Sequence, residues 1–144
     1  MSGPPAEPPI GLQLSRTARA ASQAFERALA AAGGTTATWQ VLLLVRSRNW
    51  GTQSELAKAM GVTAATLTHH LSALEQRGLI VRERQAENRR IQQVALTAAG
   101  EAMFDQLRGA ALAHDQRLRA ALDPDELTQL RTLLARLDAA LATP

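Results

Sequence analysis

The sequence predicts a mainly α fold with one small β-hairpin, and three observations carry this prediction. Apolar residues recur at three- and four-residue steps through most of the chain, as they do on one face of an α-helix. The 144 residues are 46% hydrophobic but only 3% aromatic, with no tyrosine, so leucine, alanine and valine must build the core, which favours packed helices over a β-sandwich. The short segments "LIVRER" and "IQQVAL" are partly β-branched, as strands are.

The N-terminal region is predicted to be a tail followed by a helix. Residues 1–11 include most of the prolines and should form a flexible tail. Residues 12–32 are alanine-rich with apolar side chains at helical spacing, and the pair Gly33-Gly34 ends this helix. We expect residues 12–144 to form a single domain, because this length suits one domain with an assembly element.

The middle of the chain carries a helix-turn-helix pattern. After a predicted helix over "TATWQVLLLVRS", Thr52 and Glu55 form a capping-box pattern that opens the short helix "QSELAKAM". Gly61 ends that helix, and Thr63 caps the next one, which stops at Gly78. Two helices joined by a short turn that contains glycine are typical of a helix-turn-helix.

The two strand-like segments that follow read as a hairpin, because polar "QAENRR" separates them. A hairpin directly after a helix-turn-helix is the wing of a winged helix-turn-helix, which we expect over about residues 35–97. The predicted element order is α-α-α-α-β-β-α-α.

The C-terminal region is predicted to contain two helices. Thr97 caps a long helix, and "DPDE" from Asp123 to Glu126 starts the last one, with proline in its first turn. Leucines recur along the last helix in 3-4-3-4 steps, at Leu127, Leu130, Leu134, Leu137 and Leu141. The apolar faces of helices 12–32 and 98–142 exceed what a winged helix covers alone, so we expect them to be dimerisation helices of a homodimer.

The helix after Thr63 is the candidate recognition helix. At 100° per residue, Leu67, Leu71 and Leu74 share one face and should lie in the core. The opposite face is small and polar, as a helix that enters the major groove requires. The candidate DNA-binding residues of this segment are Thr63, Ala65, Thr66, Thr68, His69, Ser72 and Arg77.

The predicted wing supplies further DNA-binding candidates. Arg82, Arg84, Arg89 and Arg90 are dense around the hairpin, and arginine at a wing tip can enter a narrow minor groove. The alternative is that these four side chains merely solvate an exposed ribbon. We select Arg89 and Arg90 as DNA-binding candidates because they follow a helix-turn-helix.

The adjacent histidines His69 and His70 do not predict a metal site. Metal ligands on one helix lie three or four positions apart, whereas adjacent side chains diverge by about 100°. The third histidine, His114, is distant in sequence, and no matching carboxylates lie nearby. We expect no metal and no cofactor, with His69 facing DNA and His70 at the border of the apolar face.

Composition excludes several classes of protein. There is no cysteine, which excludes disulfides and thiolate zinc sites. No apolar run of membrane-spanning length occurs and the N-terminus does not resemble a secretory signal, so we expect a cytoplasmic protein. All but one of the 16 basic residues are arginine, and this bias towards arginine is typical of proteins that contact phosphate or guanine. The alternative is that the bias reflects only a GC-rich genome. We find no nucleophile–base set or phosphate-binding loop and expect no enzyme activity.

Residues 35–101 resemble the MarR family of winged-helix transcriptional regulators. The matching segments are "TTATWQVLLLV", "TQSELAKAMGVTAATLTHHLSALEQRGLIVRE", "NRR" and "VALTAAGE". The resemblance implies a homodimer in which the first helix and the last two intertwine, and each protomer presents one winged helix to a half-site of a pseudo-palindromic operator. It further implies a repressor of transcription that a small aromatic anion releases from double-stranded DNA.

The resemblance also assigns residues. Thr66, Thr68 and His69 match recognition-helix contacts, and Arg90 matches the arginine that reaches the minor groove. His69 stands where arginine is common in the family, and Asn88 stands where an aspartate usually pairs with the wing arginine. The Asn88 amide offers no charge attraction to the wing arginine, and a neutral His69 ring donates only one hydrogen bond where arginine can form two. Both departures therefore point to altered operator preference or weaker affinity.

Two interpretations are possible for the ligand-binding residues, and two for the function. Inducers of this family often bind between the dimer helices and the winged helix, where the candidates are Trp39, Arg46, Trp50 and Met60. The alternative is that Trp39 and Met60 are core residues and Arg46 is solvated. The alternative function is a winged-helix interaction module that dimerises but no longer reads DNA, an interpretation motivated by the uncharged recognition face.

Overall fold

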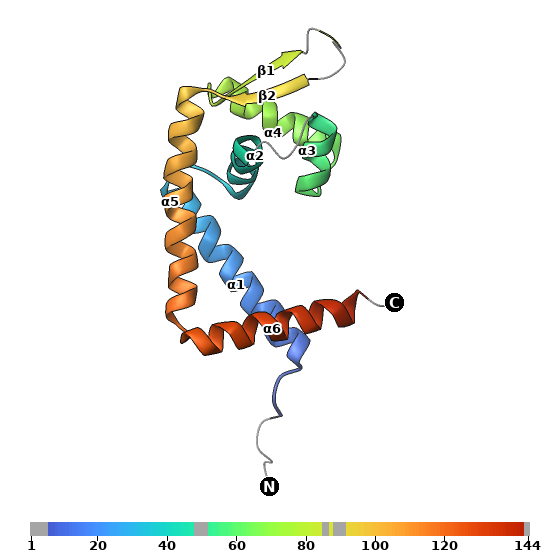
Figure 1. Cartoon of the computed structure of the whole chain (residues 1–144), viewed down its shortest axis with the longest axis vertical. Helices are drawn as coiled ribbons and strands as arrows, with labels where there is room; N and C mark the ends of the chain where they lie inside the picture. Colours follow the sequence, from blue (N-terminus) through green and yellow to red (C-terminus); the bar gives the residue numbers. More distant parts are fainter. Residues whose placement is uncertain (1–5, 48–51, 85–86, 88–91, 143–144) are drawn as a thin grey trace. The chain divides into compact units, whose positions relative to one another are not determined.

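The computed structural model describes residues 6–47, 52–84, 87 and 92–142. Its elements follow the predicted order, which confirms the mainly α fold with a β-hairpin (Figure 1). The elements are α1 (Ile10–Ala31), α2 (Thr36–Ser47), α3 (Gln53–Met60), α4 (Ala64–Gln76), β1 (Ile80–Arg84), β2 (Gln92–Leu96), α5 (Ala98–Ala120) and α6 (Pro124–Leu141).

The start of α1 differs from the expectation. The helix begins at Ile10, so two residues assigned to the flexible tail, Ile10 and Gly11, are helical. Pro9 occupies the N-cap, and its carbonyl accepts hydrogen bonds from the backbone N–H groups of Leu12 and Gln13 at 3.0 and 3.1 Å. The cluster of prolines therefore ends where the helix starts, because proline is tolerated at a helix N-terminus and not in its interior.

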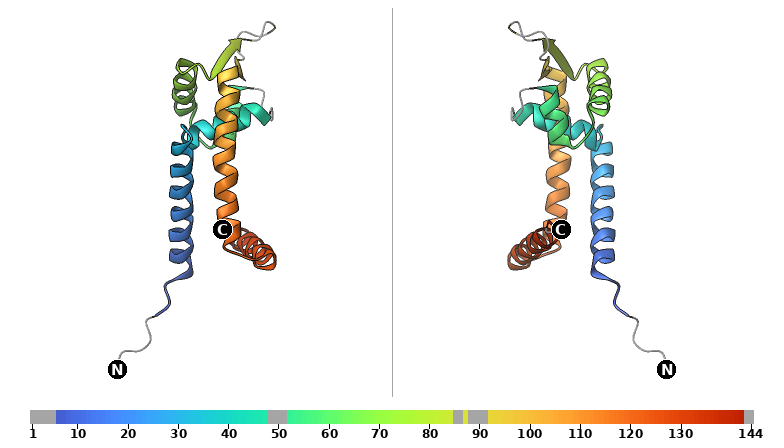
Figure 2. Two further views of the ribbon diagram at one scale, coloured as in Figure 1. Left: turned by 90° about the vertical axis from the view of Figure 1, so that its left-hand side faces the viewer. Right: turned by 90° about the vertical axis from the view of Figure 1, so that its right-hand side faces the viewer.

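The chain divides into two compact units, residues 1–111 and 112–144, with the boundary inside α5. The first unit holds α1 to α4, the hairpin and the first half of α5. Views of this unit show α3, α4 and the hairpin grouped around the start of α5 (Figure 2).

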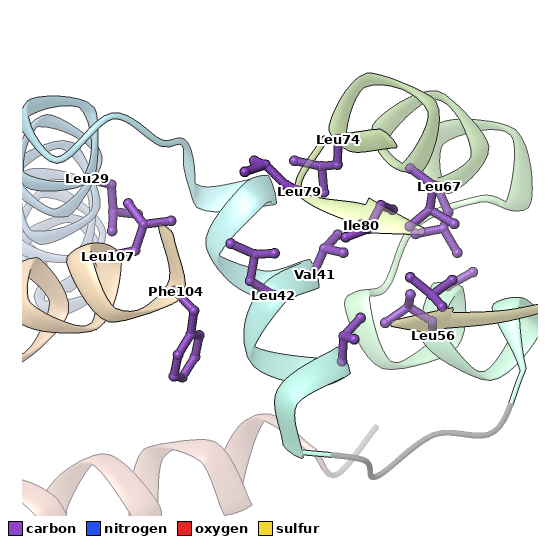
Figure 3. Packing of buried hydrophobic residues seen from close by; sticks show 14 residues of the cluster. Leu29, Val41, Leu42, Leu56, Leu67, Leu74, Leu79, Ile80, Phe104 and Leu107 are labelled. Carbon is purple, nitrogen blue, oxygen red and sulfur yellow. The ribbon is translucent and has the colours of Figure 1, made fainter. Parts of the chain in front are cut away.

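Aliphatic side chains build the core of the first unit. The three predicted leucines of α4, Leu67, Leu71 and Leu74, are buried, which confirms which face of this helix turns inward. Leu29 of α1 and Leu107 of α5 point toward each other beside α2 (Figure 3). Among the described residues, the other large side chains that are fully buried are Val41, Leu42, Leu56 and Ile80. Each buried leucine contributes about 1.5–3 kcal/mol relative to an exposed one.

Strands β1 and β2 form an antiparallel pair in which Ile80 lies opposite Leu96 and Arg82 opposite Val94. Side chains alternate between the two faces of a strand. Ile80 and Val94 are buried, whereas Val81 is 41% exposed. One face of the hairpin is therefore attached to the helical core, and the other is open.

The second unit contains the end of α5 and the whole of α6. The predicted capping box is confirmed: Asp123 Oδ1 accepts the Glu126 N–H at 2.8 Å, and Glu126 Oε1 accepts the Asp123 N–H at 3.0 Å. None of the described residues of α6 is buried. Its leucines form an uncovered apolar row, with Leu134 and Leu137 each 38% exposed and Leu133 52% exposed.

Within the described residues, no single helix has the length and apolar character needed to cross a membrane. Only α1 and α2 taken together, across a bend of 77°, reach the required length and hydropathy.

Candidate nucleic-acid interface

The recognition-helix candidate, α4, presents a small and polar face to solvent. Ala65, Thr66, Thr68 and His69 are exposed, whereas His70 and Ser72 are half-buried. The ring centroids of His69 and His70 lie 6.1 Å apart with their planes tilted by 56°. The three buried leucines on the opposite side fix this orientation, because a helix cannot turn His69 inward without exposing them.

The first turn of α4 is closed by threonine hydroxyl groups. Thr63 Oγ1 accepts the Thr66 N–H at 3.1 Å and donates to Thr66 Oγ1 at 3.0 Å. Both predicted DNA contacts therefore have a local structural role as well. A threonine N-cap is worth about 1 kcal/mol to a helix.

Thr68 connects the two helices of the helix-turn-helix. Its hydroxyl donates to the Ala64 carbonyl at 2.9 Å and accepts from Gln53 Nε2 at 3.1 Å. Gln53 was not a predicted site residue, since nothing in the local sequence pattern around it indicates a partner fifteen residues away. The bond aligns the start of α3 with the exposed face of α4.

Arg82 of β1, which is half-buried, pairs with α4. Its Nε donates to Glu75 Oε2 at 2.8 Å, and its Nη2 lies 3.4 Å from Ser72 Oγ. The hydrogen bond from Arg82, reinforced by its charge, lowers the pKa of the Glu75 carboxyl below the ordinary value. The pair attaches the base of the hairpin to α4 and neutralises Glu75, the single carboxylate of this helix.

Arg77, the C-cap of α4, is turned toward the loop between α1 and α2, where its Nη2 donates to the Gly33 carbonyl at 3.4 Å. This long contact engages a single N–H group of the guanidinium among the described residues, and the contact of Arg77 with DNA stays a prediction. Arg89, Arg90 and Asn88 lie outside the described residues, and so do the contacts predicted for the tip of the wing.

Two of the four predicted ligand residues come together in a cluster between α2 and α5. The Trp39 ring stacks on Phe104, with centroids 5.6 Å apart and planes 14° from parallel. The Arg46 guanidinium lies 5.5 Å from the centroid of the Phe104 ring and forms a salt bridge with Glu101. We call Trp39, Arg46, Glu101 and Phe104 the aromatic–arginine cluster.

Glu101 and Phe104 were not among the predicted ligand residues, because they lie on a helix that the sequence pattern assigned only to dimerisation. A carboxylate and an aromatic residue three positions apart share a helix face, which could have indicated a common partner. Trp39 and Met60 both pack against the buried core, in line with the alternative interpretation, and Trp50 lies outside the described residues.

Comparisons with known proteins agree with this geometry. The model of the MarR family matches residues 35–92. The transcriptional repressor CouR bound to a 23-mer DNA duplex is similar with 32% identity and a TM-score of 0.78, over 90% of this chain and 92% of that chain. CouR from Rhodococcus jostii RHA1 bound to p-coumaroyl-CoA is similar with 27% identity and a TM-score of 0.72, over 89% and 90% of the two chains.

A mutant of MarR from E. coli complexed with operator DNA is similar with 26% identity and a TM-score of 0.76, over 90% of this chain and 93% of that chain. The sequence identity to the DNA-bound CouR, 32%, is high enough to indicate a common family and not only a common fold, and the alignment extends over nearly the whole of both chains. This chain belongs to the MarR family of winged-helix, DNA-binding transcriptional regulators.

Proposed function

We propose that the protein is a repressor that binds a pseudo-palindromic operator as a homodimer in the cytoplasm and is released by a small aromatic anion. The exposed face of α4 is the observation that carries this proposal. Small and hydroxyl-bearing side chains at Ala65, Thr66 and Thr68 allow close approach to base edges, and His69 adds a hydrogen-bonding ring. Two relatives, CouR and MarR of E. coli, form complexes with duplex DNA.

Homodimer formation is supported by the apolar surface of the terminal helices. The row of leucines on α6 has no cover in one chain, and Ile10 and Leu12 of α1 are 70% and 43% exposed. An exposed apolar row on a helix is the kind of surface that marks an interaction site. A second copy of the chain supplies the same leucines and therefore a matching surface.

The aromatic–arginine cluster supports an anionic effector with an aromatic ring. An incoming carboxylate can replace Glu101 as the partner of Arg46, whose side chain is 52% exposed, and a ring can pack beside Trp39 and Phe104. One relative, CouR, binds p-coumaroyl-CoA, so a small-molecule ligand is compatible with this fold.

The experiment that tests repression is a gel shift with the region upstream of the protein's own gene. We expect sequence-preferring binding at nanomolar to micromolar protein that weakens steeply with salt. Replacing Arg89 and Arg90 by alanine should weaken binding and reduce the salt slope by about one unit per lost phosphate contact. Replacing Arg131 and Arg136 on α6 removes the same charge and serves as the control once sedimentation shows that this variant is still a dimer.

Unchanged binding in the Arg89 and Arg90 variant would contradict the role proposed for the wing, whereas a protein without sequence-preferring DNA binding would fit the interaction module that no longer reads DNA. Absence of any sequence-preferring binding by the unmodified protein would contradict the proposal. A thermal-shift screen against aromatic carboxylates, with Arg46→Ala as the control, tests the effector separately.

A further inference from the structure

We infer that Thr97 and Gly100 are positioning residues for DNA recognition, because they attach the C-terminal end of α4 to the first turn of α5. The inference rests on the proposed function, in which α4 reads DNA and the terminal helices form the dimer. Neither residue touches the exposed face of α4. Their effect on DNA binding would be transmitted through the turn at residues 77–79.

Thr97 bridges two segments that are distant in sequence. Its Oγ1 donates to the Gly78 carbonyl at 2.6 Å and accepts the Gly100 N–H at 3.0 Å, and its own N–H donates to the Leu79 carbonyl at 3.1 Å. A single side chain therefore caps α5 and holds the turn that follows α4. Serine offers the same hydroxyl, whereas valine has the same shape and offers none.

Gly100 lets the two segments approach more closely than any other residue would. A Cβ atom at this buried position would lie 2.0 Å from the Leu79 carbonyl oxygen and 3.0 Å from the Leu79 carbonyl carbon. An ordinary carbon–oxygen contact is about 3.3 Å, so an alanine would force a separation of about 1.3 Å. The obstacle is backbone, which cannot rotate away as a side chain does.

The turn transmits such a displacement to α4. Gly78 has φ +73°, the Leu79 N–H donates to the Leu74 carbonyl at 3.0 Å, and both leucines are buried. A displacement of Leu79 therefore also displaces the last turn of α4, to which it is hydrogen-bonded through Leu74. Because α5 is itself one of the proposed dimerisation helices, a change in the angle between α4 and the start of α5 would change the distance between the two recognition helices of the proposed dimer.

That distance must match half-sites one helical turn of DNA apart, about 34–36 Å. We therefore expect variants of the junction to lose discrimination among operators that differ in half-site spacing. Binding to non-specific DNA depends on charge alone and should be preserved.

The test uses a duplex that the unmodified protein selects from a random library, together with versions that have one base pair added or removed between the half-sites. Gly100→Ala and Thr97→Val should lose about tenfold or more in affinity for the selected duplex, a loss comparable to that from one or two mismatched base pairs. They should also discriminate less between the selected duplex and the versions with a base pair added or removed. Their affinity for unrelated DNA should stay within about threefold. Thr97→Ser should behave as the unmodified protein does.

Gly109→Ala is the matched control, because Gly109 lies on the same helix and a Cβ atom there meets nothing within 4 Å. It should raise the melting temperature. Sedimentation of this variant checks that the proposed dimer is intact, and with an intact dimer its DNA binding should be unchanged. Circular dichroism separates misfolding from mispositioning, and if Gly100→Ala does not fold, the comparison of Thr97→Val with Thr97→Ser decides the question.

If the variants fold and have the same affinity and the same preference for half-site spacing as the unmodified protein, this inference is wrong and the proposed function still stands. An unmodified protein that selects no duplex would overturn the proposed function and the inference with it.

Discussion

Replacing Thr63 by aspartate separates the two tasks proposed for the start of α4, which are to begin the helix and to face the duplex. Thr63 Oγ1 accepts the Thr66 N–H at 3.1 Å, and an aspartate at the N-cap accepts this bond at least as well. The new charge also interacts favourably with the positive end of the helix dipole, by about 0.3–1 kcal/mol. Thr63→Asp should therefore melt at or slightly above the temperature of the unmodified protein.

DNA binding should fall, because the new carboxylate lies on the exposed end of α4 that we propose faces phosphates. Two like charges about 6 Å apart repel each other by about 0.7 kcal/mol in water and about 2.8 kcal/mol at the effective dielectric constant of a protein surface. A dimer meets this repulsion once in each half-site, so the loss is about 1.4–5.5 kcal/mol. The Kd should rise by a factor of about ten to 10⁴.

Fluorescence anisotropy with a labelled operator, at one fixed salt concentration, measures this change. Thr35→Asp is the matched control, because Thr35 Oγ1 accepts the Thr38 N–H at 3.1 Å at the start of α2, so the same substitution adds the same charge at another helix cap. We expect its effect to be far smaller. Equal affinity losses in the two variants, or no loss in either, would refute the placement of α4 against the duplex.

Three further predictions concern stability and assembly. Leu71→Ala removes a fully buried side chain and should lower the free energy of unfolding by about 2–5 kcal/mol in a urea titration, whereas Leu43→Ala, at a position 40% exposed, should cost much less. Arg82 lowers the pKa of Glu75, so the stability that this pair contributes is present at neutral pH and is lost as the pH falls from the ordinary carboxyl pKa through the lowered folded-state pKa. The difference in melting temperature between the unmodified protein and Glu75→Gln should therefore disappear at acid pH; a difference independent of pH would contradict this role. Replacing Leu134 and Leu137 together by arginine should convert a dimer into monomers in sedimentation experiments, and an unchanged dimer would show that this row of leucines lies outside the interface.

The helices and their faces could be predicted because they depend on local spacing. Leu67, Leu71 and Leu74 repeat at helical steps, so the buried and exposed faces of α4 follow from the sequence alone. Helix ends at Thr63 and Asp123 could be predicted for the same reason, since a cap bonds to a residue only three positions away.

The partners of individual polar side chains could not be predicted, because tertiary packing decides them. Arg82 looks like one more arginine of the wing, yet the register that places it opposite Val94 brings it to Glu75. The approach of Gly100 to Leu79 joins segments that no periodicity relates. Glu101 and Phe104 were missed at the aromatic–arginine cluster because their partners lie on α2.

The most direct test of the central claim is the response of the histidine rings to DNA. The chain has three histidines, so selectively labelled ring resonances can be assigned by single substitutions. If the exposed face of α4 reads the duplex, adding the selected operator shifts or broadens the His69 resonance strongly and leaves that of His114 nearly unchanged. Saturating DNA binding that leaves His69 unperturbed would contradict the account.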